Sequence, residues 1–213
     1  MNIFAFPKLF EMITTIDKQT ALVLIDLQKG IVRMDMAHPV KNILLKVSML
    51  VDVFRAANLP IIIVHVNPMG AAWTKTRVEN YTLPQNPVMH TLARMVMPVM
   101  GFTDIVPEIQ IQPQDILIEK KTWNAFFQTS LNKELKKREI TQLVLAGIST
   151  SIGVEGTARA ASELGYNLIF AIDAMTDKVL EAHENSINNI FPRIGELGTV
   201  MEITRKLSPD WIK

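Results

Sequence analysis

The sequence predicts an α/β fold with three layers, in which a doubly wound, mainly parallel sheet of about six strands lies between two layers of helices. Two observations predict it. Short runs of nearly continuous apolar residues recur along the chain, and such runs are typical of strands that helices cover on both faces. Helical patterns of apolar residues lie between the runs, and this alternation of strand and helix favours a doubly wound sheet.

The expected buried strands are five apolar runs, at residues 20–25, 60–66, 115–118, 142–146 and 167–172. The clearest helix is predicted where apolar residues recur every three or four positions between Val40 and Phe54. A second helix is predicted from Val154 to Leu164, and Gly165 directly after it is a residue that commonly ends helices.

The chain is predicted to form one domain over residues 1–213, because its length and its 48% hydrophobic content suit a single core and no linker or repeat interrupts it. One stretch breaks the alternation. Residues 67–101 hold four prolines, an aromatic and polar segment and a methionine-rich apolar run that continues to Met100. Such an insertion is expected to be a lid over the substrate or an oligomer contact, and both interpretations stay open.

Charge and composition exclude several classes of protein. The 22 basic and 21 acidic residues are spread along the chain, so neither nucleic acid nor an anionic membrane surface is an expected partner. The basic cluster between Lys133 and Arg138 is interrupted by acids and is interpreted as a solvated helix face. The chain has no cysteine and its start does not resemble a secretory signal, which together favour a cytoplasmic protein without disulfides.

Polar residues follow three of the predicted strands. In a parallel sheet, ligands bind beyond the carboxyl ends of the strands. Asp26 follows the first strand, Lys120 and Lys121 follow the third, and the small residues 147–153 lead from the fourth strand into a helix. A loop acid, solvated lysines and ordinary capping of the helix by Ser149 or Ser151 would explain each feature separately. Together, an acid, a base and an oxyanion-type turn at one edge favour an active site.

Three segments carry a resemblance to a known family. ALVLIDLQKG, IEKKTWNAFFQTSL and LAGISTSIGVEGTARAASELGYNLIFAIDAMTD resemble, in this order, the motifs of isochorismatase-like hydrolases, a family within the cysteine hydrolase superfamily. The resemblance runs from Thr20 to about Leu207 and implies the isochorismatase-like, Rossmann-like version of the predicted fold.

The resemblance also implies the catalytic residues. The family's acid, lysine and nucleophilic cysteine fall on Asp26, Lys120 and Gly153, with Lys120 chosen over Lys121 because three residues separate it from Asn124. The peptide bond between Ile148 and Ser149 matches a cis bond that helps to form the family's oxyanion hole, in a turn that includes Ile152. The residues expected to contact substrate are Gln28, His65, Trp73, Trp123 and Phe126, of which His65 and Phe126 are also candidates for the core.

Gly153 has no side chain, so the covalent thiol route is closed. True isochorismatases also lack the cysteine and are thought to hydrolyse an enol ether with the aspartate as general acid. This chain differs from them too, because it has Ser149-Thr150-Ser151-Ile152-Gly153 where they have an aromatic-His-x-Gly run, and Trp123 where they have tyrosine. The metal-binding spacing of nicotinamidases is not evident among its four histidines, so neither metal nor cofactor is expected.

The leading hypothesis is therefore a hydrolase of a small molecule without a cysteine nucleophile, acting on an enol-ether or C–N bond. Asp26 would be its general acid/base and Lys120 would stabilise charge. A homo-oligomer, a dimer or larger, is expected from the resemblance. One alternative is an inactive family member that binds a small ligand or assembles with itself. Another is a serine nucleophile at Ser149 or Ser151, for which no histidine lies at a recognisable position.

Overall fold

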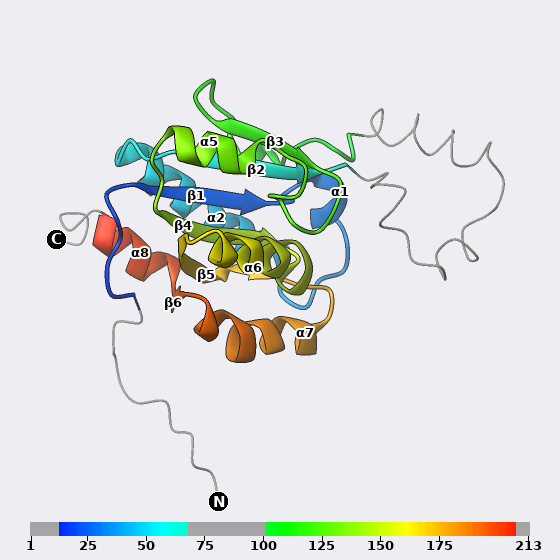
Figure 1. The fold of residues 1–213 in the computed structure, drawn as a ribbon. Helices are drawn as coiled ribbons and strands as arrows, with labels where there is room; N and C mark the ends of the chain where they lie inside the picture. The colour runs from blue at the N-terminus through cyan, green and yellow to red at the C-terminus, as the bar shows by residue number, and fades with distance from the viewer. Residues whose placement is uncertain (1–12, 68–100, 208–213) are drawn as a thin grey trace, which may run out of the picture.

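A computed structural model describes residues 13–67 and 101–207, in which six strands form one parallel sheet (Figure 1). The strands are β1 (Thr20–Ile25), β2 (Ile61–Val66), β3 (Ile116–Lys120), β4 (Gln142–Ile148), β5 (Asn167–Thr176) and β6 (Glu196–Gly198). Their spatial order is β3-β2-β1-β4-β5-β6, so the chain moves outward in one direction up to β3 and in the opposite direction from β4. The strand order therefore reverses between β1 and β4, where ligands bind in sheets of this type.

Helices connect the strands. They are α1 (Lys29–Val32), α2 (Val40–Ala56), α5 (Leu131–Lys137), α6 (Glu155–Glu163), α7 (Leu180–Asn185) and α8 (Val200–Leu207). Two wide π-helical turns, η3 (Thr150–Val154) and η4 (Ser186–Ile190), adjoin α6 and α7. The 3-10 turns are η2 (Pro107–Ile109) and η5 (Phe191–Arg193). The turn η3 continues into α6 without a break, so one helical segment begins where β4 ends.

The sheet separates two hydrophobic cores. Alternate side chains of β1 enter opposite cores, with Leu22 and Leu24 on one face and Val23 and Ile25 on the other. The apolar side of α2 and residues of α8 cover the first face, whereas α5 and α6 cover the second (Figure 1). Because strand side chains alternate between faces, apolar residues at every position are required when both faces are covered.

The predicted fold class is confirmed. The strand predicted at residues 20–25 and the helix that begins at Val40 match β1 and α2. β4 and β5 extend beyond their predicted ends, since the two strands pair again at Gly147–Met175 and Ile148–Thr176 after a register shift. The three-residue edge strand β6 was not located from the sequence.

The structure bears only in part on membrane-spanning helices, on the insertion at residues 67–101 and on the single domain. No helix in the described residues is long and apolar enough to span a membrane. The predicted insertion at residues 67–101 lies almost wholly outside the described residues, and so does Trp73, one of the expected substrate contacts. The single domain stays a prediction, although every strand in the described ranges joins the same sheet.

Candidate active site

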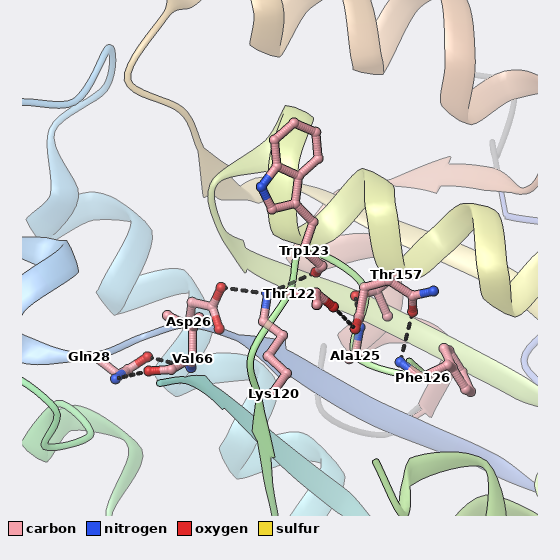
Figure 2. A network of polar contacts seen from close by, with 10 residues as sticks. Asp26, Gln28, Val66, Lys120, Thr122, Trp123, Ala125, Phe126 and Thr157 are labelled. Carbon is pink, nitrogen blue, oxygen red and sulfur yellow. Dashed lines mark hydrogen bonds and ion pairs between the residues drawn. The ribbon is translucent and has the colours of Figure 1, made fainter. Parts of the chain in front are cut away.

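Three of the predicted site residues meet at the carboxyl edge of the sheet. Asp26 directly follows β1, Lys120 is the last residue of β3, and Gly153 lies in η3. The Lys120 Nζ is 2.7 Å from the Asp26 Oδ2 (Figure 2). A Cβ placed on Gly153 would lie 3.0 Å from the Asp26 Oδ2 and 3.1 Å from the Lys120 Nζ, so the glycine backbone lies against the ion pair.

The backbone around Asp26 explains how its carboxylate reaches this position. Asp26 has a φ of 52°, a left-handed conformation that aspartate adopts more readily than most residues, and it ends the strand. Its N–H donates to the Val64 carbonyl of the neighbouring strand, at 2.9 Å. On the other side, Gly147 of β4 lies so close that a Cβ there would be 2.2 Å from the Ile25 carbonyl oxygen. A side chain at position 147 would therefore separate β4 from the site.

Asp26 and Lys120 are both removed from water, with relative exposures of 6% and 1%. The Lys120 ammonium also donates to the Trp123 carbonyl at 2.9 Å, whereas the Asp26 Oδ1 is buried with no hydrogen-bond partner in the described structure. Burial raises the pKa of Asp26 from 3.8 to about 6, against the opposing charge and hydrogen bond of Lys120. Burial therefore outweighs the ion pair, and the Asp26 carboxyl binds a proton closer to neutral pH than an exposed aspartate does.

The turn after β4 contains the cis peptide bond expected between Ile148 and Ser149. Within the turn, the Ser149 carbonyl accepts hydrogen bonds from the N–H groups of Ile152, at 3.3 Å, and Val154, at 3.1 Å. Ile148 is buried and Ile152 is exposed. The Ile152 N–H is thus engaged inside the turn, and the use of this turn as an oxyanion hole stays a prediction.

Gln28 has a structural role that the sequence did not predict. Its side-chain oxygen accepts from the Val66 N–H at 2.8 Å, and its side-chain nitrogen donates to the Val66 carbonyl at 3.1 Å (Figure 2). The same nitrogen donates to the Thr103 carbonyl at 3.3 Å. This buried amide ties the end of β2 to the chain after β1. Gln28 therefore supports the site, and its contact with substrate stays a prediction.

The ring side chains that were expected to contact substrate lie in different surroundings. Phe126 packs against one core and stacks on Tyr166, with ring centroids 5.9 Å apart, so it is a core residue, the alternative that the sequence had left open. Trp123 is 66% exposed. Its ring points away from the Lys120 ammonium, which donates to the Trp123 carbonyl (Figure 2). His65 is half-buried near the end of β2, in register with Glu119.

The segment after β3 is anchored on α6, which holds the Trp123 carbonyl over Lys120. The Ala125 N–H donates to the Thr157 Oγ1 at 3.1 Å, and the backbone near Trp123 passes so close to Gly156 that a Cβ there would be 3.3 Å from the Trp123 Cβ. Helix α6 therefore positions this segment, and it continues directly from the turn η3 that contains Gly153.

Sequence reasoning missed a second polar cluster behind the turn. Thr150 and His183 are buried with their Oγ1 and Nδ1 atoms 2.8 Å apart, and Asp177, just beyond β5, accepts two hydrogen bonds from Ser151. A histidine does lie beside a hydroxyl of this turn, contrary to expectation, but beside Thr150. Asp177 could have been found by the rule that selected Asp26, an acid directly after a strand, had the full length of β5 been recognised.

Metal coordination finds no support in the residues that the structure describes. Between residues 13 and 67 and between 101 and 207, no three His, Asp or Glu side chains are grouped so that they could hold a metal ion.

Comparison with known proteins shows the family to which the chain belongs. A family model described as the isochorismatase domain matches residues 20–202. The chain belongs to the isochorismatase family. Isochorismatase family proteins similar to it include the uncharacterized YecD of Escherichia coli O157:H7, 38% identical over 202 residues that cover 89% of this chain and 97% of YecD. Another is the uncharacterized YwoC of Bacillus subtilis strain 168, 40% identical over 190 residues that cover 89% and 95% of the two chains.

A solved structure supports the same assignment. An isochorismatase family protein from Burkholderia thailandensis has a TM-score of 0.77 and 32% identity to this chain, and the match covers 91% of this chain and 98% of the other. Membership of the isochorismatase family makes the chain a hydrolase. Its fold and the pairing of Asp26 with Lys120 are consistent with the motifs through which the sequence resembles that family.

Proposed function

We propose that this isochorismatase-family hydrolase cleaves a small molecule without a covalent enzyme intermediate, with Asp26 moving the proton. The observation that supports this most is the state of the Asp26 carboxylate. One oxygen is held by Lys120, and the other is buried with no partner in the described residues. A buried acceptor without a donor is costly, and a ligand that brings an N–H or O–H group to it would remove that cost.

The chemistry follows from the groups present. A chain with no cysteine has no thiolate to attack a carbonyl carbon. Asp26, with a pKa of about 6, is protonated often enough near neutral pH to act as an acid and ionised often enough to take a proton back. Lys120 stabilises the carboxylate charge that forms when Asp26 gives up its proton.

The proposed bond is an enol ether or a C–N bond. With an enol ether, Asp26 protonates the vinyl carbon, water adds to the resulting oxocarbenium-like centre, and the adduct releases a ketone and an alcohol. With a C–N bond, the proton goes to the leaving nitrogen while water supplies the oxygen. In each case a proton from the attacking water returns to Asp26, so the enzyme is regenerated.

A hydrolysis screen tests the proposal. Isochorismate-like enol ethers and small amides are incubated with the wild type, with Asp26→Asn and with Asp104→Asn. Asp104 is a matched control because it also pairs with a lysine, Lys29, at 2.9 Å, but at the surface. We expect one substrate class to be turned over, at least about 100-fold more slowly in Asp26→Asn and unchanged in Asp104→Asn.

Two results would overturn the proposal. Equal turnover by the wild type and Asp26→Asn would remove Asp26 from the reaction. No turnover of any compound, with the same ligand-induced thermal shifts in both proteins, would leave the alternative of an inactive member that binds a small ligand. The observation that favours this alternative is the closed ion pair itself, which could serve structure alone.

We also propose a cytoplasmic homo-oligomer with a small-molecule substrate. Membership of this hydrolase family supports the small-molecule substrate in general terms. The methionine-rich segment at residues 89–100, the candidate oligomer contact, lies outside the described residues. Sedimentation of the purified protein would measure the oligomeric state directly.

A further inference from the structure

The buried carboxylate of Asp177 accepts hydrogen bonds from the turn that follows β4. Asp177 lies directly beyond β5 and is 2% exposed. Its Oδ2 accepts both the backbone N–H and the hydroxyl of Ser151, each at 2.8 Å. Its Oδ1 accepts the N–H groups of Lys178, at 2.7 Å, and Val179, at 3.3 Å. One side chain therefore joins the start of η3 to the segment that leaves β5.

The His183 imidazole is hydrogen-bonded to Thr150, the adjacent residue of the same turn. The Thr150 hydroxyl is 2.8 Å from the His183 Nδ1 of α7, and Thr150 is fully buried. His183 in turn lies against His38, with ring centroids 4.7 Å apart, and the His38 Nδ1 is 2.9 Å from the Thr176 hydroxyl. The Thr150 hydroxyl is engaged with this imidazole, so the pair is placed to hold the turn.

The turn that they hold is the one that carries Gly153. Gly153 follows Ser151 by two residues, and its backbone lies against Asp26 and Lys120 so closely that a Cβ would be 3.0 and 3.1 Å from their charged atoms. A small displacement of the turn would therefore change how much water reaches the ion pair.

We propose that Asp177 and His183 are positioning residues of the active site, which hold residues 149–154 so that Gly153 stays against the Asp26–Lys120 pair. They act through Ser151 and Thr150, from the side of the turn that faces β5 and α7. The functional consequence rests on the proposed role of Asp26, but the geometry can be tested without a substrate.

The electrostatics of the cluster support this arrangement. Burial, and after it the neighbouring His38, lowers the pKa of His183, while Asp177 opposes the shift. Among residues 13–67 and 101–207, His38 and Asp177 are the titratable groups that shift the pKa of His183. Glu155 of α6 is engaged with the Ser186 hydroxyl and with Arg159. His183 is therefore uncharged near neutral pH and can accept the Thr150 hydroxyl.

Four variants of the full chain test the proposal by NMR. Asp177→Asn places an amide where donors converge, and Thr150→Val removes the hydroxyl but keeps the shape. Thr150→Ser restores the hydroxyl. Asp173→Asn is the matched control, because Asp173 is another carboxylate that accepts a backbone N–H, that of Val200 at 2.7 Å, but at the start of α8. The readouts are the Asp26 carboxyl pKa, the Gly153 amide resonance and the thermal midpoint.

We expect Asp177→Asn and Thr150→Val to move the Gly153 amide and to lower the Asp26 pKa by roughly one unit, since water would reach the carboxylate. Thr150→Ser should restore both readouts. Asp173→Asn should lower the thermal midpoint and leave both unchanged. If Asp177→Asn does not fold, Ser151→Ala, which removes one of the two Ser151 bonds, takes its place.

Two outcomes would overturn the inference. In one, Thr150→Val and Asp177→Asn, or Ser151→Ala in its place, leave the Asp26 pKa and the Gly153 amide unchanged. In the other, Asp173→Asn moves both as strongly, which would mean that any loss of stability has this effect. Either outcome is separate from failure of the hydrolysis screen, because no substrate enters the experiment.

Discussion

At the scale of single residues, Asp26 combines two opposing influences. Burial raises the folded-state pKa from 3.8 to about 6 although Lys120 pulls it down. Between these two values the folded protein holds a proton that the unfolded chain has lost. The contribution of Asp26 to stability is therefore present below about pH 4 and is lost as the pH rises through about 6.

This sign predicts how stability depends on pH. The free energy of unfolding of the wild type, relative to Asp26→Asn, should fall by on the order of 2–3 kcal/mol between about pH 4 and pH 7. Urea titrations of both proteins at several pH values measure it. His183, whose pKa is lowered, loses its contribution as the pH falls below about 6.5, but it is present in both proteins and cancels. A difference that does not change with pH would contradict the raised pKa.

Gly153 is the second residue on which the geometry of the site depends. A Cβ there would be 2.8 Å from the Ile25 Cγ2 as well as close to both charged groups, so there is no space for a side chain at this position. We expect Gly153→Ala to destabilise the protein by about 1–3 kcal/mol, the usual cost of overpacking, and to slow turnover. Gly156→Ala in α6, where the nearest contact would be 3.3 Å, should cost less. Chemical denaturation of the two variants compares them, and equal losses would show that Gly153 is not specially confined.

At the scale of elements, Gln28 connects three segments of the carboxyl edge. Its amide holds both backbone groups of Val66 and the carbonyl of Thr103. Gln28→Ala would leave these buried groups unpaired, and we expect a loss of about 2 kcal/mol or more. Gln19→Ala, at an exposed position, should be close to neutral. Hydrogen exchange of the Val66 amide provides the local readout, and unchanged protection in Gln28→Ala would exclude the clamp.

The elements also show why some features could be predicted from the sequence. β1, β2 and β4 have apolar residues at nearly every position because helices cover both of their faces. β6 has three residues at the edge of the sheet and no such pattern. Asp173, whose carboxylate accepts the Val200 N–H of α8, interrupts the apolar pattern of β5, and the strand's last residues were missed for this reason.

The candidate site could also be located only in part from the sequence. Asp26 and Lys120 were found because parallel strands place their carboxyl ends at one edge, and the choice of Lys120 over Lys121 agrees with their burial, since Lys120 is buried and Lys121 exposed. Which way a side chain turns has no signature in spacing, so the hydrogen bonds of Gln28 to Val66 and Thr103 were not predicted. The pairing of Thr150 with His183 joins residues far apart in sequence, and only the fold brings them together.

At the scale of the whole molecule, the order of strands creates the site. β1 and β4 are neighbours at the point where the chain reverses direction across the sheet, and their carboxyl ends carry Asp26 and the turn of Gly153. Lys120 reaches the same point from β3, beyond β2. Segments from both halves of the chain therefore converge on one ion pair, and the cores on both faces of the sheet fix their relative positions.

The most direct test of the central claim is the pH dependence of turnover in the wild type and in Asp26→Asn, with the substrate that the hydrolysis screen identifies. We predict a limb in the wild-type rate near pH 6, where the Asp26 carboxyl titrates, and in Asp26→Asn a rate at least about 100-fold lower with that limb absent. A variant that keeps both the rate and the limb near pH 6 would show that another group moves the proton.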